Sequence, residues 1–194
     1  MKMILGSASA RRKELLSLLG YEFTVDVVLV DEQLDSYDEA SDFVSKVALK
    51  KGHATLSKYP NDLVICADTI VVYKKRILGK PKDPNDARKM ISGLAGRSHN
   101  VLTGVFLNFR DYQKVFVENT KVLIDEITED EINSYIHTDE PYDKAGGYAI
   151  QGLFGKHVKS IQGDFYNVMG LPINRLYQEI KRIETLYDIW FKKK

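Results

Sequence analysis

The sequence MILGSASARRK, residues 3–13, encodes a short apolar strand that leads through two serines into the start of a basic helix. The apolar run predicts a strand over residues 2–6, and the spacing that follows predicts a helix over residues 9–19. The helix stops at Gly20, and its expected apolar stripe consists of Leu15, Leu16, Leu18 and Leu19. A strand that turns directly into a helix is the beginning of an α/β fold.

The charges in the first turn of this helix indicate an anion site. Arg11, Arg12 and Lys13 stand where the positive end of the helix dipole disfavours cations. The unpaired N–H groups and the same dipole attract anions. The cluster is therefore explained by a bound anion, most simply a phosphate chain, and the alternative is a solvated basic turn.

The composition argues against several classes of protein. The 194 residues carry 28 basic and 27 acidic side chains, so no strong net field attracts nucleic acid or a membrane. The single cysteine, Cys66, excludes an internal disulfide, fits a reducing compartment and is interpreted as core packing. We see no signal peptide and no membrane-spanning run, so a cytoplasmic location is expected.

Strand and helix patterns alternate along the chain, which predicts a mixed α/β fold with a central sheet and flanking helices. The hairpin and short helix at residues 101–138 are a candidate second lobe. The expected strands cover residues 22–28, 63–67, 70–73, 101–109, 114–124 and 157–161, and residues 146–152 form a strand or loop. The expected helices begin at Ser41, Pro84, Thr128 and Pro172.

Carboxylates suited to a metal or a water follow the most apolar strand. Asp68 comes where residues 63–67 end, and such strand ends line the ligand crevice of α/β sheets. Asp31 and Glu32 begin an acidic loop at residues 31–39. Together these carboxylates would supply oxygen ligands for Mg²⁺ or activate a water. The alternatives are a turn residue at position 68 and an ordinary solvated loop.

Two further segments carry candidate substrate contacts. Lys80 stands between Gly79 and Pro81, where the proline restricts the backbone and aims the charge, although a surface turn is the alternative. Gln151 lies in the glycine-rich segment 143–152, where its amide would read a base edge through paired donor and acceptor groups. The alternative there is a bulged strand. The four histidines form no metal-binding spacing.

In combination these pieces resemble the Maf (septum-formation-inhibitor-like) family of nucleoside triphosphate pyrophosphatases. The resemblance extends from residue 4 to about residue 183, and the order and spacing of the motifs make it specific. The matching stretches are residues 7–12, 30–32, 67–69, 78–81, 93–99, 103–105, 143–148, 150–152 and 167–172. One departure is Ala10, where the family usually has proline, and alanine is equally able to occupy a first helical turn.

The resemblance implies a single domain over residues 1–194, with two lobes around a cleft as in the inosine triphosphate pyrophosphatases, and a homodimer. The implied reaction splits a nucleoside triphosphate into monophosphate and pyrophosphate with Mg²⁺ or Mn²⁺. Asp68, matching the proposed general base, and Glu32 would hold the metal, and it stays open whether Asp68 itself takes the proton. The other implied catalytic residues are Lys51 and Lys80, and the implied substrate contacts are Ser7, Ser9, Arg11, Arg12, Thr69 and Gln151.

Three of these positions resemble the subfamily that acts on dTTP and UTP. They are Arg11, Thr69 and Gln151, where the subfamily preferring 7-methyl-GTP typically has tryptophan, glutamine and glutamate. A glutamine amide matches the O4 and N3–H edge of thymine or uracil. Two alternatives are a purine-directed pyrophosphatase and a nucleotide-binding regulator of cell division in which turnover is incidental.

Overall fold

The computed structural model describes residues 1–34 and 36–193. Asp35 of the predicted acidic loop and the last residue, Lys194, lie outside the described residues. The chain forms two compact units. Unit 1 comprises Met1–Asp68, Thr103–Glu118 and Gly170–Lys194, and unit 2 comprises Thr69–Leu102 and Asn119–Met169.

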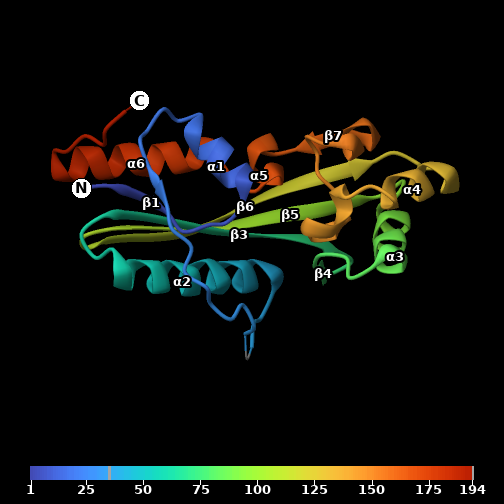
Figure 1. The fold of residues 1–194 in the computed structure, drawn as a ribbon, viewed down its shortest axis with the longest axis horizontal. Helices are drawn as coiled ribbons and strands as arrows, with labels where there is room; N and C mark the ends of the chain where they lie inside the picture. The colour runs from blue at the N-terminus through green and yellow to red at the C-terminus, as the bar shows by residue number, and fades with distance from the viewer. Residues whose placement is uncertain (35, 194) are drawn as a thin grey trace. The chain divides into compact units, whose positions relative to one another are not determined.

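Unit 1 is a sheet with helices on both faces. The order of its strands is β2 (Thr24–Val25), β1 (Met3–Leu5), β3 (Leu63–Tyr73), β5 (Ser98–Phe109) and β6 (Tyr112–Ile124), the last three of which continue into unit 2. Strand β1 pairs in parallel with both β2 and β3. Helix α2 (Ala40–Lys58) covers one face, and α1 (Ala10–Ser17) and α6 (Ile173–Tyr187) cover the other (Figure 1).

The core of unit 1 explains why the start of β3 is a continuous apolar run. Residues 63–67 are all buried, as expected for a strand covered by helices on both faces. Val64 and Cys66 form a cluster with Ala48 of α2 and Phe106 of β5, and all four side chains are fully buried. The interpretation of Cys66 as core packing is confirmed, and burial raises the pKa of its thiol.

Unit 2 is built from hairpins and short helices. Strand β4 (Arg76–Leu78) pairs antiparallel with β3, and β7 (Val158–Gln162) pairs antiparallel with β6. Helix α3 (Pro84–Leu94) packs against α4 (Glu129–Ile136). The remaining helices are η1 (Glu140–Asp143), η2 (Ala145–Gly147), η3 (Leu153–His157) and α5 (Phe165–Met169), and the η elements are 3₁₀ helices.

Most local signals in the sequence are confirmed. Pro84 opens α3, and Thr128 and Glu131 form both bonds of the capping box of α4. Strands β5 and β6 form the expected hairpin, and β7 and α6 lie where they were predicted. The mixed α/β class is confirmed. Within residues 1–34 and 36–193, none of the helices combines the length and apolar character needed to cross a membrane.

Three predicted elements were wrong in detail. Helix α2 begins at Ala40 rather than being capped by Ser41, whose hydroxyl instead donates to Glu39 Oε1 at 2.7 Å. Helix α1 ends at Ser17, so Leu18 is 60% exposed instead of extending the apolar stripe. The strand expected at residues 22–28 is limited to the two residues of β2, because its partner β1 has only three residues. For residues 146–152 the loop alternative is confirmed, because successive positive φ angles at Gly146 and Gly147 turn the chain and no strand forms.

Candidate active site

Asp68 lies within β3 and beyond the end of β1. The register of β1 with β3 finishes at Leu5 opposite Ile65, and the Gly6 N–H adds a last bond to the Ile65 carbonyl at 2.9 Å. The prediction that the strand stops at Asp68 was wrong, because the continuation of β3 pairs with β4 from Val71 onward. The expectation that strand ends line a ligand crevice therefore holds for the carboxyl end of β1, where the chain turns into α1.

One lysine bridges two carboxylates in unit 1. Lys51 of α2 places its Nζ 2.7 Å from Asp68 Oδ1 and 2.8 Å from Glu32 Oε1. The side chains of Lys51 and Asp68 are each 14% exposed, whereas that of Glu32 is 58% exposed. Since burial lowers the local dielectric, the contact of Lys51 with Asp68 is the stronger of the two. The structure thus brings together three predicted catalytic residues that are distant in sequence.

The helix turn that follows Lys51 packs closely against Gly6 and β3. The Thr55 hydroxyl donates to the Lys51 carbonyl at 3.0 Å, and Cys66 Sγ donates to Thr55 Oγ1 at 3.4 Å. A Cβ atom at position 6 would lie 2.4 Å from Cys66 Sγ and 2.7 Å from Thr55 Oγ1. Only glycine therefore allows the end of β1 to approach α2 and β3 this closely.

Arg12 is held in a fixed orientation by the protein. Its Nε donates to the Gly170 carbonyl at 2.8 Å, and its Nη1 donates to Ser7 Oγ at 3.2 Å. Burial lowers the pKa of Arg12, while the negative charges of Asp68 and Glu32 act in the opposite direction. Those carboxylates are therefore close enough to stabilise the guanidinium charge.

The two serines of the opening motif support α1 and Arg12. Ser9 is the N-cap of α1, and its hydroxyl accepts from the Arg12 backbone N–H at 3.4 Å. Ser7 is buried and accepts from the Ser9 N–H at 3.3 Å in addition to the Arg12 side chain. Arg11 is half-buried in the first turn of α1. The strand–serine–helix motif thus presents two guanidinium groups from a capped helix N-terminus.

The remaining predicted residues, Thr69, Lys80 and Gln151, belong to unit 2, and Thr69 directly follows Asp68 in β3. Lys80 is exposed, and the carbonyl of its neighbour Gly79 accepts from the Gly146 N–H at 2.9 Å. This bond joins the Lys80 loop to the glycine-rich segment. Gln151 is exposed in a turn that is closed by a bond from the Gly152 N–H to the Ala149 carbonyl at 3.2 Å.

The donor set in unit 1 fits a hard divalent cation. Glu32 and Asp68 reach the same nitrogen of Lys51, so the two carboxylates are placed to share one small cation. Mg²⁺ is typically held by one or two carboxylates together with substrate phosphates. Among the side chains of residues 1–34 and 36–193, no group of three or more His, Cys, Asp and Glu residues is arranged to hold a metal by itself. An ion bound here would complete its coordination with water and with oxygens of the substrate.

Comparison with known proteins settles the family. The model of the family described as Maf-like protein matches residues 2–183. This chain belongs to the Maf-like protein family. Among its relatives, the dTTP/UTP pyrophosphatase of Bacillus cytotoxicus is 47% identical over 184 residues, covering 95% of this chain and 96% of the relative. A dTTP/UTP pyrophosphatase of Bacillus cereus is 46% identical over 181 residues, covering 93% of this chain and 95% of the relative.

Solved structures share the fold of this Maf-like protein at low sequence identity. The Ham1 protein of Staphylococcus aureus superposes with a TM-score of 0.52 at 14% identity, covering 94% of this chain and 99% of the other. The Ham1 protein of Coxiella burnetii gives a TM-score of 0.54 at 12% identity with the same coverage. These similarities show the fold alone.

Two features of this Maf-like protein escaped sequence reasoning. The Gly170 carbonyl orients Arg12, and the only signal for it was the matching stretch at residues 167–172, to which no role was attached. In unit 2, His99 Nε2 lies 2.6 Å from the hydroxyl of Tyr148. Burial lowers the pKa of His99 to about 4, so its ring is neutral at pH 7 and anchors the glycine-rich segment without a charge.

Proposed function

We propose that this Maf-like protein is a nucleoside triphosphate pyrophosphatase that hydrolyses dTTP and UTP to the monophosphate and pyrophosphate. The observation that carries the proposal is Lys51 held between Asp68 and Glu32, with the oriented Arg12 in the same unit. A carboxylate beside fixed cations suits proton transfer and phosphate binding. The names and the 46–47% identity of the two Bacillus relatives support the same activity.

The residues of unit 1 divide the proposed chemistry between them. Water attacks the α-phosphorus, the bond from that phosphorus to the bridging oxygen breaks, and pyrophosphate leaves. Asp68 takes the proton from the attacking water, and Lys51 stabilises the negative charge that develops. Arg12 offers N–H donors whose orientation is already fixed, so little reorganisation is needed when the phosphates bind. Arg11, Ser7 and Ser9 add contacts to the triphosphate. Lys80 of unit 2 stays a predicted catalytic residue on the strength of the family resemblance.

Activity is expected to require Mg²⁺ or Mn²⁺, which Asp68 and Glu32 would hold. The ion supplies positive charge to the phosphates. Pyrophosphate release should fall to background in excess EDTA and return on addition of either ion. Glu32→Gln should raise the Mg²⁺ concentration that gives half-maximal rate, because it removes one anionic ligand. Full activity in excess chelator would contradict this role.

Base selection is expected to depend on Gln151, which with Arg11 and Thr69 is one of the three positions that resemble the dTTP/UTP subfamily. A glutamine amide both donates and accepts, as the edge of thymine or uracil requires. We expect pyrophosphate release from dTTP and UTP to exceed that from dATP, dGTP and 7-methyl-GTP. Gln151→Glu should lower kcat/KM for dTTP by roughly tenfold, because a carboxylate has no N–H to donate.

The matched control for this substitution is Gln162→Glu, which changes an exposed glutamine of β7 in the same unit. It should leave the substrate preference unchanged. If 7-methyl-GTP proves the best substrate of the unmodified protein, the base assignment is wrong while the pyrophosphatase activity stands. A homodimer stays a prediction of the family resemblance, and a cytoplasmic location stays a prediction from the sequence.

A further inference from the structure

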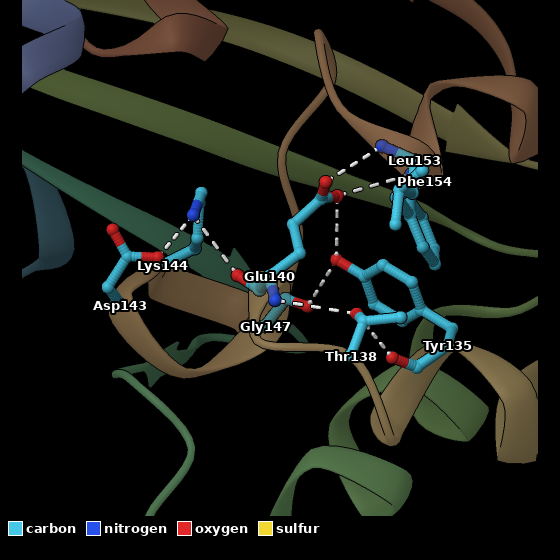
Figure 2. Close-up of polar contacts among 8 residues, drawn as sticks. All are labelled: Tyr135, Thr138, Glu140, Asp143, Lys144, Gly147, Leu153 and Phe154. Atoms are coloured by element: carbon cyan, nitrogen blue, oxygen red, sulfur yellow. Dashed lines mark hydrogen bonds and ion pairs between the residues drawn. The ribbon is translucent and has the colours of Figure 1, made fainter.

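One carboxylate of unit 2 is surrounded by donors from the segment that carries Gln151. Glu140, the first residue of η1, accepts from the Leu153 N–H at 2.8 Å through Oε2. Its Oε1 accepts from the Phe154 N–H at 3.2 Å and from the Tyr135 hydroxyl at 3.1 Å. Figure 2 shows the carboxylate of Glu140 between Tyr135 of α4 and the start of η3.

The backbone next to Gln151 is shaped to receive this carboxylate. A Cβ atom at Gly152 would lie 2.2 Å from Glu140 Oε2 and 2.5 Å from its carboxyl carbon. Glycine is therefore needed at position 152 for the Glu140 side chain to reach the two N–H groups beyond it. The turn that contains Gln151 ends at this same glycine.

Tyr135 ties the network to the other end of the glycine-rich segment. Its hydroxyl lies 3.1 Å from the Gly147 carbonyl and 3.1 Å from Glu140 Oε1, so it donates to either acceptor (Figure 2). Burial and the negative charge of Glu140 raise the pKa of Tyr135, which keeps the hydroxyl protonated. Residues 147–154 are thus fastened on both sides of Gln151, at Gly147 and at Leu153 and Phe154.

We propose that Glu140 is a positioning residue for base selection, because its carboxylate fixes the turn that presents Gln151. This inference rests on the proposed function, in which Gln151 contacts the base. An amide selects between hydrogen-bonding edges only while its donor and acceptor are held in place. A turn released from Glu140 lets the Gln151 amide rotate, and the rotated amide pairs equally well with cytosine, whose amino group replaces the O4 acceptor.

The test compares substrates on one sample of protein. In Glu140→Gln one carboxylate oxygen becomes an NH₂ group that cannot accept, so at least one of the bonds from Leu153, Phe154 and Tyr135 is lost while the size of the side chain is kept. The ratio of kcat/KM for dTTP to that for dCTP should fall about tenfold, with kcat for dTTP changed by no more than about threefold. The ratio is independent of the fraction of folded enzyme, so a general loss of stability does not move it.

Three further variants sharpen the test. Gly152→Ala should reproduce the loss of selectivity by displacing the Glu140 carboxylate, and it carries the test if Glu140→Gln does not fold. Glu131→Ala is the matched control, since it removes a carboxylate that caps α4 in the same unit and should leave the ratio unchanged. The double variant Glu140→Gln/Gln151→Ala should be no less selective than Gln151→Ala alone, because Glu140 acts through Gln151.

Amide hydrogen exchange tests the anchor without any activity. Exchange at Leu153 and Phe154 should become faster in Glu140→Gln than in the parent. An unchanged dTTP-to-dCTP ratio in a folded Glu140→Gln protein, or an equal fall in Glu131→Ala, would overturn the proposal alone. A parent that releases pyrophosphate from no nucleotide would overturn the proposed function, and a parent without preference for dTTP and UTP would overturn its base assignment. Either result also removes the role proposed for Glu140.

Discussion

Asp68→Asn is expected to lower the rate of pyrophosphate release by a factor of about 10² or more. The amide keeps the shape of the side chain, yet it neither takes a proton from water nor supplies an anionic ligand. Lys51 keeps its contact with Glu32 at 2.8 Å, so the local structure should survive. Single-turnover kinetics with dTTP measure the rate of pyrophosphate release, and a thermal unfolding curve shows whether the variant is folded.

The matched control is Asp26→Asn. Asp26 is also bound by a lysine of α2, since it accepts from Lys58 and from the Tyr59 hydroxyl. It takes no part in the proposed chemistry, so this variant should retain the parental rate. Near-normal turnover by a folded Asp68→Asn protein would show that Asp68 neither takes the proton nor holds an ion that turnover requires.

Arg12→Ala is expected to cost about 2–4 kcal/mol of transition-state stabilisation, as for other preorganised donors. That cost corresponds to a fall in kcat/KM of roughly 30- to 900-fold. The guanidinium is oriented by the Gly170 carbonyl and by Ser7, so it meets the triphosphate without having to be ordered first. Arg12→Lys should restore little, because an ammonium group lacks the fork that spans these two acceptors.

Arg175→Ala provides the comparison for Arg12. Arg175 also belongs to unit 1 and donates to a backbone carbonyl, that of Val117, at 2.9 Å. Its loss removes a similar set of protein contacts with no expected effect on catalysis. If Arg12→Ala and Arg175→Ala show the same kinetics as the parent, Arg12 is a structural residue of α1 and not part of a phosphate site.

Elements with strong local signals could be predicted from the sequence. Pro84, the capping box at Thr128 and Glu131, and the apolar face of α6 each specify a helix through contacts within a few residues. Residues 63–67 indicated a strand buried on both faces because they contain no polar residue. The prediction failed for the length of β2 and for the continuation of β3 past Asp68. In both cases the residue at which the strand ends is set by the neighbouring strand and not by the strand's own residues.

The candidate site was predicted as separate residues. Chemistry and spacing favoured Asp68, Glu32, Arg11 and Arg12, and the resemblance to the family added Lys51, Ser7 and Ser9. No local pattern placed Lys51 between two carboxylates, since it lies on a helix where exposed lysines are common. Nor did any pattern give Gly170 or Glu140 a role, because a backbone carbonyl and a lone glutamate have no signature of their own.

The sequence by itself determined the family, the mixed α/β class and the residue types available for phosphate chemistry, because motifs and periodicity are local properties of the chain. Only the tertiary structure decided which charges meet. Lys51 reaches Asp68 because Gly6 lets the end of β1 approach α2 and β3 without a side chain between them. Glu140 reaches the backbone beyond Gln151 because Gly152 leaves room for its carboxylate. Both contacts depend on excluded volume between segments distant in sequence, which local patterns do not encode.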